Sequence, residues 1–138
     1  MPNSILIVDD HPTNLKLLSF ALRARGFTVV TAADAEQALA AIKAEKPKLI
    51  LMDLQLPGMS GYDLTTQIKR DPATAEVPVI AVTGYAMKGD EERALAAGCD
   101  GYITKPVDLT VLRDLVARLV PQTPPLPMTP PADDAPPE

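Results

Sequence analysis

The sequence contains very little cysteine and few aromatic residues. It has one cysteine, Cys99, no tryptophan, three tyrosines and two phenylalanines in 138 residues. A lone cysteine excludes an intrachain disulfide, and no Cys/His metal-ligand spacing surrounds it. We therefore expect a protein of a reducing compartment in which Cys99 is a small packing residue. A domain of this length buries enough surface to fold without a covalent or metal staple.

Long apolar runs and basic stretches are also missing. The apolar run that follows the first four residues stops at Asp9, so it is too short for a signal peptide or a membrane span. The formal charge is −5, from 13 basic and 18 acidic residues without a Lys/Arg-rich stripe. We predict a cytoplasmic protein with no membrane partner and no direct nucleic-acid partner.

The composition changes at Pro121. Residues 121–138 contain eight prolines, three acids and no Lys or Arg, and such a segment cannot bury enough apolar surface to fold. We expect a folded domain over residues 1–120 and a disordered Pro-rich acidic tail or linker over residues 121–138. A spacer role is favoured over a Pro-x-x-Pro ligand role for this tail.

Short apolar runs alternate with helical patterns along residues 1–120. The runs cover residues 5–8, 27–31, 49–52, 77–82 and 101–103. Most are apolar at every position, which is typical of parallel strands covered on both faces. Helices are expected from about residue 12 to Gly26, over 35–44, from about 60 to 70, near 87–97, and after the N-cap Asp108. The repeated βα unit predicts one α/β domain, a doubly wound five-stranded parallel sheet of order 2-1-3-4-5.

Polar, chemically capable residues end most of these predicted strands. Asp9 and Asp10 follow the first strand and Asp53 ends the third, so all three should meet in the crevice at the carboxyl ends of the strands. Close carboxylates repel one another unless a cation lies among them. Hard oxygen ligands with one open face suit Mg²⁺.

The fourth and fifth strands add groups that suit an anion. Thr83 supplies a hydroxyl, Gly84 a backbone N–H that a ligand can approach closely, and Lys105 a positive charge. Together with a bound Mg²⁺ ion, these groups match an anion with several oxygens. The pattern indicates phosphoryl transfer.

These motifs, taken in order, resemble a known family. Asp9-Asp10, residues 51–61, Val82-Thr83-Gly84 and Lys105-Pro106 resemble the response-regulator receiver domain of two-component signalling, in the CheY-like superfamily. The resemblance covers nearly all of residues 4–120. Residues 87–103 further resemble DivK-like single-domain response regulators and the receiver domains of hybrid histidine kinases.

The resemblance implies a phosphoacceptor and a metal site. Asp53 would accept a phosphoryl group from a histidine kinase or a histidine phosphotransfer protein. Mg²⁺ would be bound by Asp10 and Asp53, by Asp9 through water, and by the backbone carbonyl of Gln55. The protein would be a phosphoacceptor with self-phosphorylation and slow autodephosphorylation only, and not an enzyme that turns over a substrate. Gln55 and Tyr85 would tune the lifetime of the acyl phosphate.

The resemblance also implies a switch. Lys105 would pair with the phosphoryl oxygens, with Gly84 beside them, and Thr83 would move to hydrogen-bond one of these oxygens. Tyr102 would turn inward and alter the surface of the fourth helix, fifth strand and fifth helix, which would control a downstream protein target. The Lys105-Pro106 bond resembles one that is cis in the family. We expect a monomer, and a phosphorylation-dependent dimer stays open, as does the choice between a stand-alone regulator and part of a longer protein.

Other interpretations of the same residues are weaker. Asp9 and Asp10 could only cap a helix, and His11 is expected to be an exposed residue at the helix start with no role as phosphate donor or metal ligand. A dehalogenase-type phosphatase would need an Asp-x-Asp pattern on the first strand, where the sequence reads Asp9-Asp10-His11. A flavin or nucleotide module would need a Gly- or Ser/Thr-rich phosphate loop there, which is absent.

Overall fold

Five strands alternate with five helices along the part of the chain that the computed structural model describes, residues 4–56, 58–84 and 89–120. The strands are β1 (Ser4–Val8), β2 (Thr28–Ala32), β3 (Leu49–Asp53), β4 (Val79–Thr83) and β5 (Gly101–Thr104). The helices are α1 (Pro12–Arg23), α2 (Ala35–Ala44), α3 (Gly61–Arg70), α4 (Asp90–Ala97) and α5 (Leu109–Leu119). All strand pairs are parallel, and the order β2-β1-β3-β4-β5 confirms the predicted α/β fold.

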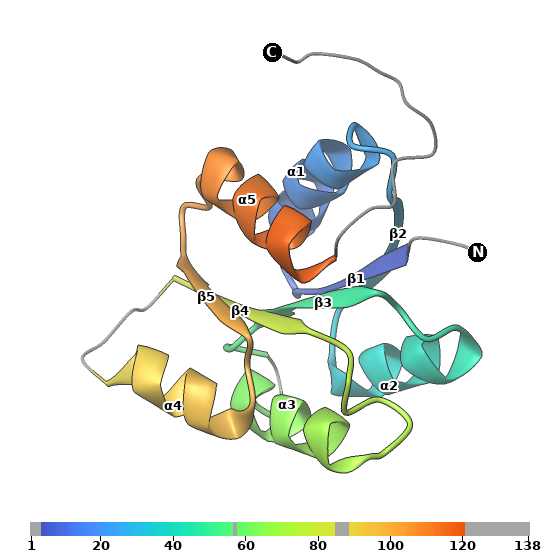
Figure 1. Cartoon of the computed structure of the whole chain (residues 1–138), viewed down its shortest axis with the longest axis vertical. Helices are drawn as coiled ribbons and strands as arrows, with labels where there is room; N and C mark the ends of the chain where they lie inside the picture. The colour runs from blue at the N-terminus through green and yellow to red at the C-terminus, as the bar shows by residue number, and fades with distance from the viewer. Residues whose placement is uncertain (1–3, 57, 85–88, 121–138) are drawn as a thin grey trace.

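The sheet is the middle layer of three. Helices α1 and α5 cover one face, and α2, α3 and α4 cover the other (Figure 1). Strands β1, β3 and β4 are buried at every position, because each lies inside the sheet with helices on both faces. The edge strand β2 is buried only at Val29 and Ala32. Apolar side chains form a core on each face, and Cys99 belongs to the one beneath α2, α3 and α4, as predicted.

Side-chain caps fix where three of the helices begin. Asp34, Ser60 and Asp108 each accept a hydrogen bond from a backbone N–H in the first turn of α2, α3 and α5. These positions agree with the predicted starts of the third and fifth helices. Helix α1 starts differently, because Pro12 occupies its first turn and the side chain of His11, the N-cap residue, makes no capping hydrogen bond.

The predicted ends of the first and fourth helices have different outcomes. Regular helix α1 ends at Arg23 with Ala24 as its C-cap. Gly26, at φ +93°, closes this helix end as the predicted left-handed cap, because its N–H donates to the Arg23 carbonyl at 3.0 Å and the next N–H, of Phe27, donates to the Leu22 carbonyl at 3.2 Å. Helix α4 begins at Asp90, and the predicted start near residue 87 lies outside the described residues, as does the predicted tail over 121–138. Within the described ranges, no helix has the length and apolarity that crossing a bilayer requires.

Candidate functional site

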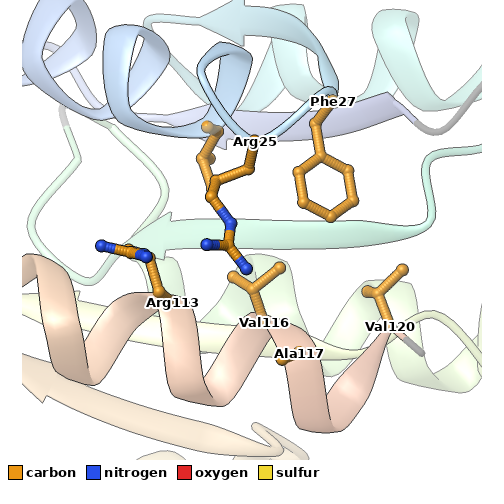
Figure 2. A pocket seen from close by; sticks show the side chains of 7 residues that line it. Arg25, Phe27, Arg113, Val116, Ala117 and Val120 are labelled. Carbon is orange, nitrogen blue, oxygen red and sulfur yellow. The ribbon is translucent and has the colours of Figure 1, made fainter. Parts of the chain in front are cut away.

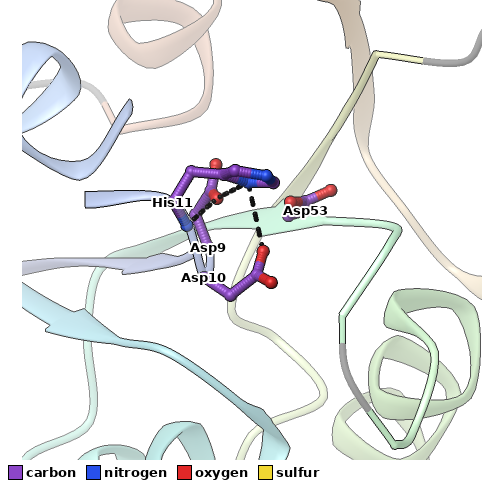
Figure 3. A group of neighbouring side chains, drawn as sticks. All are labelled: Asp9, Asp10, His11 and Asp53. Atoms are coloured by element: carbon purple, nitrogen blue, oxygen red, sulfur yellow. Dashed lines mark hydrogen bonds and ion pairs between the residues drawn. The ribbon is translucent and has the colours of Figure 1, made fainter. Parts of the chain in front are cut away.

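An acidic pocket lies at the carboxyl ends of β1 and β3. Asp9 follows β1 and is 1% exposed, Asp53 ends β3 and is 2% exposed, and Asp10 is exposed at the surface. One ligand atom from each of these residues and from His11 lies within 4.8 Å of the others. Figure 3 shows the four side chains turned toward one another. The parallel sheet thus brings together residues that are more than forty positions apart in the sequence.

Lys105 joins the pocket from the loop after β5. Its Nζ donates hydrogen bonds to Asp9 Oδ2 at 3.2 Å and to Asp53 Oδ2 at 3.3 Å. The backbone holds this lysine in place, because its N–H donates to the carbonyl of Thr83 at 2.7 Å. The Lys105-Pro106 peptide bond is cis, the conformation that the resemblance suggested. One cation therefore contacts both buried carboxylates.

The environment of Asp53 disfavours its charged form. Burial raises the pKa of Asp53 above its ordinary value of 3.8, and the nearby carboxylate of Asp9 adds to this. The backbone N–H of Gln55, which donates to Asp53 Oδ1 at 2.9 Å, and the ammonium of Lys105 act in the opposite direction without cancelling the effect. Burial and the neighbouring carboxylate therefore outweigh the two groups that favour the charged form of Asp53.

The residues of the pocket fit a hard divalent cation. Two buried carboxylates and one exposed carboxylate converge there, and oxygen donors of this kind are the ligands of Mg²⁺. A second positive charge beside Asp9 and Asp53 would lower the pKa of Asp53 again, because opposite charge favours the ionised carboxylate. The chemistry of the donors and the raised pKa both agree with such an ion.

The remaining predicted site residues surround this pocket. Thr83 ends β4 and is 2% exposed, and Gly84 follows it at the surface, where the nearest atom to an added Cβ would be Lys105 Cδ at 3.7 Å. Tyr102 of β5 is half-buried on the side of α3 and α4. Burial raises the pKa of Tyr102, and Asp90 and Glu91 raise it further. Tyr85 lies outside the described residues.

Two residues of the site were not predicted from the sequence. Gly61, the first residue of α3, packs directly on the end of β3, and an added Cβ would overlap the backbone oxygen of Asp53 and lie 2.6 Å from Leu54 Cα. His11 turns its imidazole into the acidic pocket, although it is exposed at the helix start as expected. The sequence Pro57-Gly58 before α3 predicts a tight connection, but no sequence signal indicates what Gly61 contacts.

Comparison with known proteins identifies the family of this site. Residues 5–117 match the response regulator receiver domain. The chain belongs to this family. Receiver domains are the phosphoacceptor parts of two-component signalling systems, which agrees with the resemblance noted in the sequence.

Relatives of this receiver domain include proteins with curated names and solved structures. It is 43% identical over 109 residues, 79% of this chain and 89% of the relative, to the polar-differentiation response regulator DivK of Brucella anthropi. A putative response regulator from Chloroflexus aurantiacus has a TM-score of 0.83 at 30% identity, covering 88% of this chain and all of that one. The receiver domain is therefore similar to these two response regulators over most or all of their length.

One structural neighbour contains a metal ion. The receiver domain of a sensor histidine kinase from Pseudomonas aeruginosa has a TM-score of 0.80 at 34% identity, covering 88% of this chain and 100% of its own. It is described with a magnesium ion coordinated in its active-site cleft. The acidic pocket of the present receiver domain has the donor atoms for the same kind of ion.

A separate cavity lies away from the acidic pocket. It has a volume of about 360 Å³ between the turn after α1 and the last turns of α5 (Figure 2). Arg25, Arg113 and apolar side chains including Phe27, Val116 and Val120 line it. These residues lie near the start of β2 and in α5, whereas Asp53 is at the carboxyl end of β3, so the cavity takes no part in the acidic site.

Proposed function

We propose that this receiver domain accepts a phosphoryl group on Asp53 from a phosphohistidine of a histidine kinase or phosphotransfer protein, in a Mg²⁺-dependent reaction. The observation that carries the proposal is the placement of Asp53. Its carboxylate is buried at the end of β3, Oδ1 is held by the Gln55 N–H, and Oδ2 faces Lys105. A carboxylate oriented from both sides can serve as a nucleophile without losing its geometry.

The proposal includes the metal ligands that the family resemblance implies. In this proposal Asp10 and Asp53 bind Mg²⁺ directly, Asp9 contributes through water, and the backbone carbonyl of Gln55 completes the protein ligands. Bound Mg²⁺ supplies positive charge for the carboxylates and for the phosphoryl oxygens of the donor. The clustered donor atoms support a cation in this pocket, as does the raised pKa of Asp53, which a bound cation would lower.

The transfer step needs only an ordered nucleophile and charge stabilisation. A carboxylate oxygen of Asp53 forms a bond to phosphorus while the P–N bond of the phosphohistidine breaks, and the bonding pair returns to the imidazole nitrogen. The product is an acyl phosphate on Asp53. Lys105 then exchanges its contact with the carboxylate oxygen for a contact with a phosphoryl oxygen.

In this proposal, phosphorylation of Asp53 changes the surface formed by α4, β5 and α5. Thr83, next to the pocket, moves to hydrogen-bond the phosphoryl group close to Gly84, and Tyr102 turns inward behind it. Moving a two-state surface from 1:99 to 99:1 requires about 5.5 kcal/mol. Charged hydrogen bonds from Lys105 and Thr83, at about 1.5–3 kcal/mol each, supply a large part of this. Gln55 and Tyr85 tune how long the acyl phosphate lasts.

The proposed partners are proteins of the cytoplasm. A kinase or phosphotransfer protein supplies the phosphoryl group, and a downstream protein target binds the switched surface. A monomer is proposed for the unphosphorylated form. The net charge of −5 gives no support for direct nucleic-acid binding.

The direct test is an intact-mass spectrum after incubation with acetyl phosphate or phosphoramidate and Mg²⁺. We expect one phosphoryl adduct on the wild-type protein, lost in EDTA and absent from Asp53→Asn. Asp114→Asn is the matched control, because Asp114 is an exposed aspartate of α5. This variant should form the adduct at the wild-type rate.

The result distinguishes the switch from a phosphatase. Inorganic phosphate measured in the same reactions should stay below one equivalent per protein during the first round of labelling, because labelling releases acetate or ammonia and phosphate is freed only when the acyl phosphate hydrolyses. Rapid release of many equivalents would instead indicate an enzyme that turns over phosphate esters. An adduct that persists in Asp53→Asn would exclude Asp53 as the acceptor.

A further inference from the structure

The α1–α5 cavity, between the turn after α1 and the last turns of α5, combines an apolar floor with two arginines (Figure 2). Leu22, Phe27 and Val116 form its floor and are buried as part of the core. Arg25 and Arg113 are exposed beside them, and Figure 2 shows Arg25 reaching from the turn toward α5. The volume of about 360 Å³ falls in the range of about 300–1,000 Å³ typical of ligand pockets.

The two arginines of this cavity have no ionic partner in the part of the chain that the structure describes. The ion pairs found within residues 4–56, 58–84 and 89–120 all use other basic side chains. Residues 12–26, which form one wall, contain three basic residues and no acid, although the protein as a whole has a formal charge of −5. The cavity is therefore a basic site on an acidic protein, and it favours an anionic occupant.

Residues 121–138 have the complementary charge and follow directly from the edge of the cavity. Val120, the last described residue, lines the cavity. The segment after it contains three acids and no basic residue, and Leu126 and Met128 are its only large apolar residues apart from prolines. An acidic segment with two large apolar side chains matches a basic cavity with an apolar floor.

The length of this segment is sufficient to return along α5. Arg113 lies seven residues before Val120, which corresponds to about 10 Å along a helix. An extended chain rises about 3.1 Å per residue, so Met128 can lie up to about 25 Å from Val120 and Asp133 up to about 40 Å. Enough length remains for the chain to reverse direction, and closing so short a loop costs little entropy.

We propose that residues 121–138 dock in the α1–α5 cavity of their own chain. The large apolar side chains, Leu126 and Met128, pack on its floor, and the acidic pair Asp133-Asp134 faces its two arginines. Docking requires no secondary structure in the segment, because proline already restricts its backbone to extended conformations. This inference does not rest on the proposed function, since the cavity takes no part in the acidic site.

Covalent attachment makes a weak contact sufficient for this docking. A segment joined through a short linker has an effective concentration in the millimolar range. A contact with a dissociation constant of about 1 mM would therefore be occupied about half of the time or more. Half occupancy contributes only RT ln 2 to the stability of the fold, so the melting temperature changes by less than about 2 °C.

The apolar contact is tested by nuclear magnetic resonance on the full chain at neutral pH. We expect nuclear Overhauser effects from the Leu126 and Met128 methyl groups to the Phe27 ring. The double variant Leu126→Ser, Met128→Ser should also shift the amide resonances of Phe27 and Val116, whereas the control Thr129→Ser should leave them unchanged. Absence of these effects and shifts would overturn the inference. Shifts that grow with protein concentration would place the segment in a second copy, and would also overturn docking within one chain.

The charged contact is tested by the reaction of arginine with phenylglyoxal in about 0.15 M salt, with each modified residue located by peptide mass spectrometry. Arg25 and Arg113 should react about twofold faster in the double variant Asp133→Asn, Asp134→Asn than in wild type, because the carboxylates cover them about half of the time. Arg118, an exposed residue of α5 outside the cavity, is the internal control and should react equally in both proteins.

Two results of this reaction would overturn the inference. Equal rates in the two proteins at both cavity arginines would show that the acids do not approach them. An increase of the same size at Arg118 would show that the acids act through non-specific attraction to α5. Neither readout requires Mg²⁺ or phosphorylation, so a negative result here leaves the phosphoryl adduct on Asp53 as a separate test.

Discussion

At the scale of single residues, Asp53 is both the centre of the site and a source of instability. Burial keeps its pKa above 3.8 even though Lys105 and the Gln55 N–H favour the charged form. A carboxyl group whose pKa is higher in the folded state stabilises the fold most when it is protonated. In metal-free protein this stability is present below about 3.8 and is lost as pH rises through the raised pKa.

Replacing Asp53 by Asn should therefore stabilise the metal-free protein at neutral pH. We expect a melting temperature in EDTA higher by about 4 °C, the effect of about 1 kcal/mol in a domain of this size. The difference should shrink as pH falls toward 4. Mg²⁺ should stabilise wild type more than Asp53→Asn, because it binds the folded pocket. A lower melting temperature of the variant in EDTA would mean that attraction to Lys105 exceeds the cost of burial.

Lys105 is expected to affect the rate of phosphorylation more than any surface lysine. Lys105→Gln removes the cation that contacts both Asp9 and Asp53. A charged hydrogen bond contributes about 1.5–3 kcal/mol, so adduct formation with acetyl phosphate should slow about tenfold or more. Lys46→Gln is the control, because Lys46 pairs only with exposed Glu76 among the described residues. Equal rates in wild type and Lys105→Gln would remove Lys105 from the chemistry.

The sequence predicted which residues form the site wherever their position at the end of a strand decides it. Asp9, Asp53 and Lys105 each follow an apolar strand, and the parallel topology brings strand ends together. The contacts of His11 with Asp9 and Asp10 were not predictable, because they depend on the side-chain rotamers of these neighbouring residues. A histidine after two aspartates reads equally well as a residue at the start of a helix.

At the scale of elements, the start of α3 packs closely on the end of β3 at Gly61. Gly61 leaves no room for a side chain against Asp53 and Leu54, and its N–H donates to the Leu54 carbonyl at 3.2 Å. Gly61→Ala must displace α3 or the end of β3. We expect a loss of about 2 kcal/mol or more in urea unfolding and slower phosphorylation of Asp53.

A second glycine variant separates crowding from the general effect of adding a methyl group. Gly84→Ala places a Cβ at an ordinary contact distance of 3.7 Å from Lys105 Cδ. Its stability should change by less than about 1 kcal/mol. If both variants unfold at the same urea concentration, the close approach at Gly61 has no energetic importance.

Lys69 connects α3 to the loops that lead into β4 and β5. Its Nζ donates to the carbonyl of Val77 at 2.7 Å and to Asp100 Oδ2 at 2.9 Å, and the same Asp100 oxygen accepts from the Val79 N–H. Lys69→Met keeps the apolar stem but leaves these acceptors without their cation. We expect a loss of about 1–3 kcal/mol in urea unfolding. Lys46→Met should cost less than about 0.5 kcal/mol, and equal losses would contradict the role of Lys69.

Element boundaries followed from the sequence to within a few residues, and contacts between elements did not. Apolar runs and N-cap residues located β1, β3, α3 and α5, because those signals are local. The left-handed glycine Gly26 closes the end of α1 as predicted, although the regular helix stops at Arg23. The Lys69–Asp100 contact joins a residue of α3 to a residue in the loop before β5. The apolar periodicity of the sequence does not indicate such a pairing.

At the scale of the whole molecule, the βα repeat determined the architecture. Each apolar strand needs cover on both faces, and each connection between parallel strands is a right-handed crossover. These two constraints leave few arrangements, and the observed order β2-β1-β3-β4-β5 is a common one. Global topology was thus easier to predict than the position of any single side chain outside the strands.

The division of the chain at residue 120 leads to a prediction about truncation. Val116 and Val120 belong to the core between α1, α5 and the sheet, and the family match ends at residue 117. We propose that residues 1–120 suffice for folding and for phosphorylation of Asp53. A stop after Val120 should shift the melting temperature by less than about 2 °C, because it removes no apolar side chain of the described core.

A stop after Leu115 provides the contrast for this truncation. It removes two buried valines, 3% and 8% exposed, together with the last turn of α5. Losing buried aliphatic side chains costs about 2 kcal/mol or more each, so this shorter protein should melt far below wild type or fail to fold. If the stop after Val120 is nearly as damaging, residues 121–138 stabilise the domain, and their Pro-rich composition cannot be that of an independent tail.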